Sequence, residues 1–455
     1  MFKLVKKNNT KKLLEAIKPS DKLAKNKEVF STFKEKDTTY FVMDKKTNPK
    51  DLIWRLRDVF LTLDSDTSVD LRTFGQQLEE KYREGFLTQA ILTNELVNYA
   101  PFSLKSKQDK KEPSFIFCDY HYSVLNKEIK ALSEAFNFAR KVQLMPSNYL
   151  NPKKFVSEVT KLFAPYKSAV DIKVLNDDQI EKKGMGLLSA VGKGSTKDDG
   201  PMLLSITFKK SKPDFTLIGK GVTFDTGGIN LKPSSALKGM QYDMTGASIA
   251  VAVMYAFAAL KKTPNFGIVV PLAENDISAH CTKVGDIMKA YNGKTVEMTN
   301  ADAEGRLILA DAVTYAIKDL KTKNVATIAT LTGGVIVALG DTHSAYWATD
   351  DKQAKALKEA ADLSCEYVCQ FPFHYSVKKR VLNRSVVADY INSDESRAAQ
   401  PIAGAEFIKL FAEGVNFMHF DIAGTCEYKS AGKTQPVPIL MYTLFNFVKN
   451  NYNGK

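Results

Sequence analysis

The chain has 455 residues, of which 44% are hydrophobic and 25% are charged, and its formal net charge is +13. This length exceeds what one ordinary core organises, so we expect two domains or one large unit with a smaller partner. The composition is that of a globular protein and excludes disordered and collagen-like chains. Five scattered cysteines suit reduced thiols better than a disulfide framework.

Hydrophobicity and charge along the chain indicate whether it spans a membrane or binds nucleic acid. The weakly polar stretch 248–260 is far shorter than the roughly 20 residues that a membrane span needs, which predicts a buried helix. The basic amino terminus lacks the features of a secretory signal, so we expect a cytoplasmic protein with no membrane partner. Residues 1–50 hold 14 lysines, no arginine and six acidic residues. We interpret them as a solvated surface, because clustered arginines and interleaved aromatics are missing. A nucleic-acid-binding regulator that uses this basic region is the alternative.

The amino-terminal part and the remainder differ in pattern. Residues 1–121 mix short apolar runs with charged connectors, which predicts a small α/β domain. From residue 124 apolar side chains recur every three or four positions, as in an amphipathic helix, and Pro146 ends this pattern. We therefore expect an N-terminal domain at 1–121, a connecting helix at 122–145 and a larger second domain at 146–455.

Beyond this helix, strand-like runs alternate with helical segments. The strand candidates are 202–208, 215–218, 266–272 and 325–331, and the helical ones are 244–260 and 307–320. Such alternation predicts an α/β fold in which helices flank both faces of a central, mostly parallel sheet. In sheets of this kind ligands bind beyond the carboxyl ends of the strands.

The first polar cluster in this region spans residues 219–233. Lys220 stands between two glycines directly after a predicted strand, and Asp225 follows at the end of the next apolar run. The segment lacks the spacing of a phosphate-binding loop. The tripeptide Asp225-Thr226-Gly227 resembles an aspartic protease loop, but that mechanism needs a second such tripeptide, which the sequence lacks.

Two further clusters precede predicted helices. Asp243, taken alone, is best interpreted as a helix N-cap. Asp302, Glu304 and Arg306 would point to one side of an extended stretch, where they could form a surface salt-bridge ladder.

Taken together, the clusters favour a metal site. Four carboxylates, from Asp225, Asp243, Asp302 and Glu304, lie at the ends of apolar elements. Brought together without cations they would suffer like-charge and desolvation penalties. Two divalent ions would balance their charge, and such a pair is a recurrent device for hydrolysis.

Six motifs resemble the cytosolic leucyl aminopeptidase family, two-metal enzymes that include bacterial aminopeptidase A. In chain order they are GKGVTFDTGG (219–228), DMTGA (243–247), PLAEN (271–275), NADAEGRL (300–307), ATLTG (329–333) and HFDIAGT (419–425). The resemblance implies a leucyl aminopeptidase that hydrolyses the N-terminal peptide bond through a metal-bridged water. It also implies a preference for leucine and other apolar first residues, a role in peptide turnover and a homohexamer acting on peptides with a free N-terminus.

The resemblance also assigns roles to single residues. The implied metal ligands are Lys220, Asp225, Asp243, Asp302 and Glu304, with Asp225 and Glu304 bridging two ions and Lys220 acting as a neutral amine. Zinc and manganese are the expected metals, and cobalt and magnesium also suit oxygen-rich ligation.

Three other groups complete the implied site. Lys232 would polarise the scissile carbonyl, and Arg306 would hold a bicarbonate ion as general base. Met240, Thr330 and Gly333 would line the pocket for the first side chain. Ala301 and Gln241 differ from the residues that are usual in the family at these positions. Because both lie close in sequence to implied ligands, they would affect the groups that surround the metals.

Overall fold

The computed structural model describes residues 3–4, 12–63, 67–106, 114–116, 122–196, 199–382, 384–394, 396–430 and 433–453. Its contacts divide the chain into two compact units. One unit comprises Met1–Asn137 with Lys358–Tyr367, and the other comprises Phe138–Leu357 with Val368–Lys455.

The first unit is built on a six-stranded sheet with the order β1-β6-β5-β2-β4-β3. Its neighbours are parallel except for the pair β3 and β4. The strands are β1 (Lys3–Leu4), β2 (Lys12–Ile17), β3 (Thr32–Glu35), β4 (Thr38–Val42), β5 (Thr67–Asp70) and β6 (Ser114–Ile116). The helices are α1 (Pro49–Thr62), α2 (Leu71–Gly75) and α3 (Glu80–Asn98).

Local chemistry explains where these helices begin and what they bury. Helix α1 begins at Pro49, and the side chain of Asn48 accepts a hydrogen bond from Lys50 N at its first turn. The rings of Phe41, Phe74 and Phe86 form a contiguous buried cluster between strand and helices. The predicted amphipathic helix is present as α4 (Tyr122–Leu144), which begins in this unit and ends in the other.

The second unit contains a nine-stranded sheet with the order β16-β15-β18-β14-β9-β11-β8-β7, and β10 pairs with β11. Its strands are β7 (Val170–Leu175), β8 (Met202–Phe208), β9 (Phe215–Gly219), β10 (Gly221–Asp225), β11 (Phe266–Asn275), β14 (Asn324–Ala329), β15 (Ser344–Ala348), β16 (Val368–Gln370) and β18 (Asn416–Asp421). Strands β18, β14, β9, β11 and β10 run parallel, whereas β15, β8 and β7 introduce antiparallel pairs. The sheet is therefore mostly parallel, as predicted.

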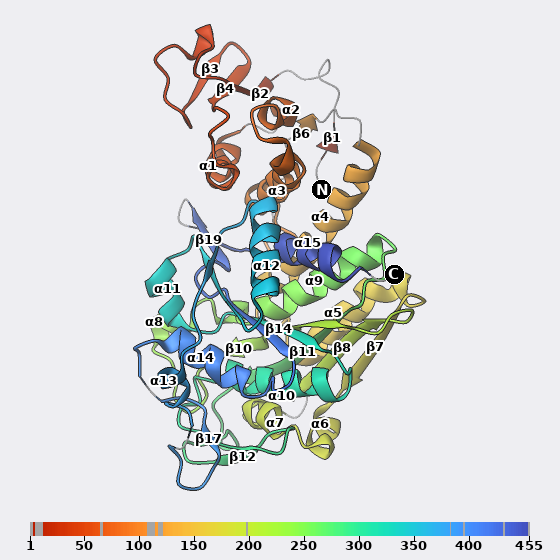
Figure 1. The fold of residues 1–455 in the computed structure, drawn as a ribbon, viewed down its shortest axis with the longest axis vertical. Coiled ribbons are helices and arrows are strands. Elements are labelled where there is room, and N and C mark those ends of the chain that lie inside the picture. Colours follow the sequence, from red (N-terminus) through yellow and green to blue (C-terminus); the bar gives the residue numbers. More distant parts are fainter. Residues whose placement is uncertain are drawn as a thin grey trace. The chain divides into compact units, whose positions relative to one another are not determined.

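Helices cover both faces of this sheet (Figure 1). Helices α5 (Pro152–Phe163), α9 (Thr245–Ala259) and α15 (Met441–Asn451) pack on one side, and α7 (Gly186–Gly192), α10 (Gly305–Lys318) and α14 (Gln400–Lys409) on the other. The remaining elements are α6 (Asp177–Lys183), α8 (Ser234–Leu237), α11 (Gly333–Leu339), α12 (Asp351–Leu363), α13 (Tyr375–Lys378), the small sheet of β12 (Ile287–Lys289), β13 (Thr295–Glu297) and β17 (Tyr390–Ile391), and the hairpin of β19 (Glu427–Ser430) and β20 (Lys433–Pro436). This arrangement confirms the predicted fold class.

Helix α9 is apolar throughout and lies in the core. The stretch Met240–Ala259 is long and apolar enough to cross a bilayer, but 89% of it is buried within the protein. The helix contacts β9, β11 and β14 and also α15. Its hydrophobicity is therefore accounted for by burial against the sheet.

A buried carboxylate joins the helices on the opposite face. Asp311, on α10, accepts hydrogen bonds from the backbone N–H groups of Leu187 and Leu188 at 2.9 and 3.0 Å and from that of Tyr291 at 2.8 Å. Burial raises the pKa of Asp311 to about 7, although these three N–H groups lower it. The start of α7 has no cap from its own N-cap side chain, so Asp311 supplies the acceptor from another element.

We expect Asp311→Ala to destabilise the protein by about 2 to 4 kcal/mol, because it leaves three buried donors without an acceptor. Urea unfolding of the purified variant measures this loss. Asp171→Ala, on the exposed face of the outer strand β7, is the matched control and should unfold like the parent chain. Equal unfolding midpoints for the two variants would contradict this role of Asp311.

Candidate metal centre and active-site cavity

Parallel strands end side by side at one edge of the second unit's sheet and bring the predicted residues there. Lys220 follows β9 directly, and Thr330 follows β14, whose Ile328 is in register with Gly219. Asp225 is the last residue of β10 and pairs with Asn275, the last residue of β11. The side chains therefore meet because the register of neighbouring strands places their ends together.

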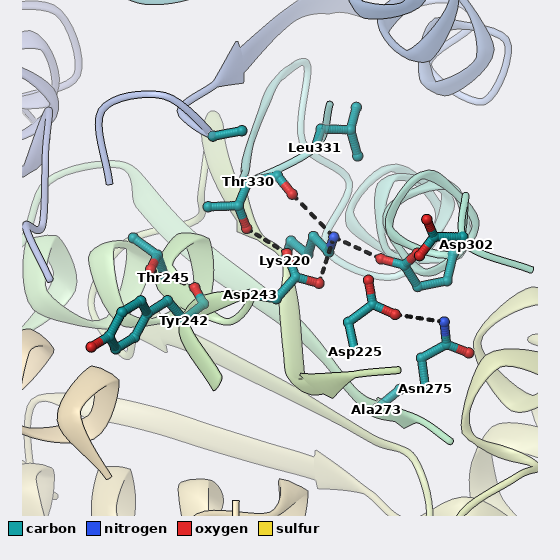
Figure 2. Close-up of polar contacts among 12 residues, drawn as sticks. Lys220, Asp225, Tyr242, Asp243, Thr245, Ala273, Asn275, Asp302, Thr330 and Leu331 are labelled. Carbon is teal, nitrogen blue, oxygen red and sulfur yellow. Dashed lines mark hydrogen bonds and ion pairs between the residues drawn. The ribbon is translucent and has the colours of Figure 1, made fainter. Parts of the chain in front are cut away.

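Lys220 is at the centre of the cluster (Figure 2). Its Nζ lies 2.7 Å from Asp243 Oδ2 and 2.7 Å from Glu304 Oε1, and it donates a hydrogen bond to the carbonyl of Thr330 at 3.1 Å. The contact with Asp243 lacks hydrogen-bond geometry, so the buried Oδ2 accepts no hydrogen bond from the described residues. One buried amine thus joins residues from β9, the start of α9 and the start of α10.

A glycine makes room for this amine. A Cβ atom built on Gly305 would lie 2.7 Å from both Cε and Nζ of Lys220. Any larger residue at the first position of α10 would displace the amine from the carboxylates. Gly305 is therefore required by the position of Lys220.

Lys232 holds the other half of the cluster. Its Nζ is 2.8 Å from Asp225 Oδ2 and also forms an ion pair with Asp302. Gly227 N donates to Asp225 Oδ1 at 2.9 Å from a backbone with φ of +88°, a conformation that favours glycine. Both Lys220 and Lys232 are thus paired with carboxylates in this structure.

Neighbouring side chains orient the carboxylates. Asn275 Nδ2 donates to Asp225 Oδ1 at 2.8 Å and to the carbonyl of Ala301 at 3.1 Å, and Figure 2 shows the first of these contacts. Thr330 Oγ1 donates to Asp243 Oδ1 at 2.6 Å. These fixed hydrogen bonds aim the carboxylate oxygens before any ligand arrives.

The crowded carboxylates perturb one another. Burial and the Glu304 carboxylate raise the pKa of Asp302 to about 6, against the lowering effect of Lys232. Burial raises the pKa of Asp243 well above its ordinary value, and the charge of Lys220 only partly opposes this. Burial alone would lower the pKa of Lys220 and of Lys232, but the surrounding carboxylates outweigh it and raise both.

The donor set fits divalent cations. Carboxylate oxygens of Asp225, Asp302 and Glu304 lie within 4.8 Å of one another. Asp243 adds a further buried carboxylate oxygen, Oδ2, which lies 2.7 Å from the amine of Lys220. An oxygen-rich group of closely spaced carboxylates is the environment that hard or borderline divalent ions stabilise.

These residues line a cavity of about 540 Å³. Its walls include all five predicted metal ligands and Lys232, and also the three residues predicted for the first side chain: Met240, Thr330 and Gly333. Arg306 is not among the lining residues. It is a buried residue of α10, where its Nη1 donates to the carbonyl of Asn392 at 2.9 Å and its Nε has no partner among the described residues.

Two sequence-based alternatives for these residues do not describe the structure. Asp243 does not cap α9, because its Oδ1 accepts from Thr330 and the N-cap position is Met244. The stretch before α10 is a turn and not an extended strand, so Asp302, Glu304 and Arg306 do not alternate along one face. Glu304 and Arg306 are buried, which excludes a surface salt-bridge ladder.

Two positioning residues were not predicted from the sequence. Asn275 orients Asp225, and Asp421, at the end of β18, accepts hydrogen bonds from Leu331 N at 3.1 Å and from the hydroxyl of Thr332 at 2.5 Å. Burial raises the pKa of Asp421 to about 6. Both residues end strands and lie within quoted motifs, which is a signal that could have identified them.

Comparison with known proteins agrees with this geometry. Residues 137–441 match the catalytic domain of the cytosol aminopeptidase family. The probable cytosol aminopeptidase of Mycoplasma genitalium is 38% identical over 346 residues, which are 76% of each chain. That of Metamycoplasma salivarium is 33% identical over 454 residues, 97% of this chain and 86% of the relative.

The chain belongs to the cytosol aminopeptidase family. It is therefore a metal-dependent aminopeptidase, a hydrolase that acts on peptides with a free N-terminus. The family match covers residues 138–357 and 368–441 of the unit that contains the carboxylate cluster and its cavity.

Solved structures show the same fold at greater sequence distance. The bottromycin maturation enzyme BotP superposes with a TM-score of 0.83 at 23% identity, covering 98% of this chain and all of its own. A second structure of BotP, described as a complex with Mn, also gives a TM-score of 0.83 and covers 97% of this chain and 99% of its own. At 23% identity, this superposition establishes a shared fold and nothing more.

Proposed function

We propose that the chain is a leucyl aminopeptidase whose cavity holds two divalent metal ions. Asp225, Asp243, Asp302, Glu304 and Lys220 would hold these ions, and Asp225 and Glu304 would contribute to both. Lys220 ligates as a neutral amine, because an ammonium group has no lone pair. Zinc or manganese, and also cobalt or magnesium, suit this donor set. When bound, two such ions activate a water molecule and stabilise the charge that develops during hydrolysis.

The chain's own side chains position the peptide. Asp243 lies in the cavity wall beside Met240, so its carboxylate receives the free amino group of the substrate. Lys232 reaches the same cavity with a cationic amine and holds the carbonyl oxygen as it becomes negative. Binding through a free amine restricts cleavage to the first peptide bond.

Arg306 would hold a bicarbonate ion, which would supply the general base. Support comes from its unpartnered, buried Nε, since an uncompensated guanidinium N–H favours an anion. The carbonyl of Asn392 fixes the other end of the guanidinium. Arg306 does not line the cavity, so the bicarbonate ion and not the guanidinium would contact the substrate.

Apolar first residues are accommodated by the small and apolar side chains of the cavity wall. Met240, Thr330 and Gly333 line this part of the cavity together with Ala423 and Cys426. These side chains are small or apolar, which suits leucine and similar residues. We propose a role in peptide turnover on this basis.

The observation that carries the proposal is the group of three carboxylates within 4.8 Å of one another in the cavity. The test is digestion of a leucine-initiated peptide and of its N-acetylated form by the metal-loaded protein, followed by mass spectrometry. Sequential loss of residues from the free peptide alone is expected. Equal cleavage of both peptides, or internal cleavage, would contradict the proposal.

A further prediction concerns Asn275. We expect Asn275→Ala to raise the dissociation constant for Mn²⁺ about 10- to 100-fold, because Asp225 loses the donor that orients it. Calorimetric titration of the metal-depleted protein with MnCl₂ measures this change. Asn292→Ala, on a loop outside the cavity, is the control, and an unaltered Mn²⁺ affinity in Asn275→Ala would refute the role.

Assembly and organisation complete the proposal. We propose a cytoplasmic homohexamer with a small domain at 1–121, a connecting helix at 122–145 and a catalytic domain at 146–455. Exposed apolar side chains such as Val337 and Val386, which are 91% and 99% exposed, support contacts between copies. Sedimentation equilibrium tests the assembly, and a monomer would contradict it.

The nucleic-acid-binding alternative gains no support from the relatives.

A further inference from the structure

One carboxylate in the cavity wall lies outside the metal cluster. Glu427, the first residue of β19, lines the cavity with the predicted ligands but is not part of the group of carboxylates that lie within 4.8 Å of one another. Its side chain is 25% exposed. Glu427 is neither a proposed metal ligand nor a proposed catalytic residue.

The surroundings of Glu427 place it at the pocket for the first side chain. A Cβ atom built on Gly239 would lie 3.2 Å from Glu427 Oε1, so this carboxylate lies directly over a residue that has no side chain. Gly239 precedes Met240 in the chain, and Cys426 precedes Glu427. Met240 and Cys426 both line the cavity. This part of the cavity therefore has the side chains of Met240 and Cys426 beside a carboxylate, and Lys238, which precedes Gly239, also lines the cavity.

The present ion pair of Glu427 is weak and exchangeable. Lys429 Nζ lies 3.6 Å from Glu427 Oε2, and the Lys429 side chain is 74% exposed. In contrast, the cluster carboxylates contact the buried amines of Lys220 and Lys232 at 2.7–2.8 Å. An exposed ion pair at this distance contributes little free energy, so a cation that lies closer to Glu427 can replace Lys429.

We propose that Glu427 binds the charged end of a lysine or arginine side chain at the first position of the substrate. This inference rests on the proposed aminopeptidase function and extends its substrates from apolar first residues to basic ones. The methylene groups of such a side chain pack along Met240 and Cys426 while the charge reaches the carboxylate. An arginine can make two parallel hydrogen bonds to it, which a leucine cannot.

The test compares kcat/KM for arginine p-nitroanilide with that for leucine p-nitroanilide in the metal-loaded protein. The parent chain is expected to hydrolyse both. In Glu427→Gln the arginine-to-leucine ratio should fall about tenfold or more, and in Glu427→Lys it should fall further. Glu181→Gln, an exposed position on α6 away from the cavity, should keep the parent ratio.

The outcomes separate this inference from the function on which it rests. Failure of the parent chain to hydrolyse leucine p-nitroanilide would overturn the aminopeptidase proposal and this inference with it. Hydrolysis of the leucine substrate without the arginine substrate would overturn only the role of Glu427. So would a ratio that stays at the parent value in both Glu427 variants. A ratio that falls in both variants but not in Glu181→Gln supports it.

Discussion

Replacing Asp302 by asparagine is expected to lower kcat/KM for leucine p-nitroanilide at least ~1,000-fold, since the amide removes one of the negative charges on which two-metal hydrolysis depends. Asp302 lies in a turn, and its side chain is 35% exposed. Its contribution to folding is therefore small, and the melting temperature should change by no more than about 4 °C. Asp302→Asn is therefore expected to remove activity while leaving the stability of the fold almost unchanged.

The control for Asp302→Asn is Asp178→Asn, the same change on the exposed first turn of α6. It should retain full activity. Metal analysis of both proteins adds a second measurement, because loss of a ligand should reduce the bound metal below two ions per chain in Asp302→Asn alone. An Asp302→Asn protein with more than a tenth of the parent activity would show that this carboxylate is not a ligand.

The second large effect is expected at Lys232. Lys232→Met should lower kcat about 100- to 1,000-fold with a smaller change in KM, because the amine is needed mainly for the charge that develops in the transition state. Burial and the neighbouring carboxylates act in opposite directions on the pKa of Lys232, and the net effect is to raise it. The amine therefore stays cationic at neutral pH as long as those carboxylates remain charged.

Lys182→Met, on the exposed face of α6, is the control for this substitution and should leave kcat unchanged. A Lys232→Arg variant tests the role further, because it preserves the charge but not the compact shape of the ammonium. Partial recovery of kcat in Lys232→Arg is expected. Equal kcat values for Lys232→Met and the parent chain would exclude an oxyanion role.

Local sequence patterns predicted the strands and helices that carry the site. The strand at 202–208 matches β8, and the helix at 244–260 matches α9 to within one residue at each end. These segments were predictable because apolar runs and helical periodicity are local properties. The positions of Lys220 and Asp225 at the ends of apolar runs also predicted where the first cluster would lie, since parallel strands end at one edge of a sheet.

Details that depend on distant residues were not predictable in this way. The pairing of Asn275 with Asp225 depends on the register between β10 and β11, which no local pattern specifies. Similarly, Asp421 reaches the Thr332 hydroxyl because β18 lies beside β14. Asp302 and Glu304 were expected on one side of an extended stretch. The chain forms a turn there instead, because α10 begins at Gly305. Glu427 belongs to a hairpin outside the six motifs.

The most direct test of the account is removal and restoration of metal. After exhaustive treatment with a chelator, hydrolysis of leucine p-nitroanilide is predicted to fall at least ~100-fold, and added Mn²⁺ or Zn²⁺ should restore it as binding approaches two ions per chain. Full turnover by a protein shown by elemental analysis to contain no divalent metal would contradict the account.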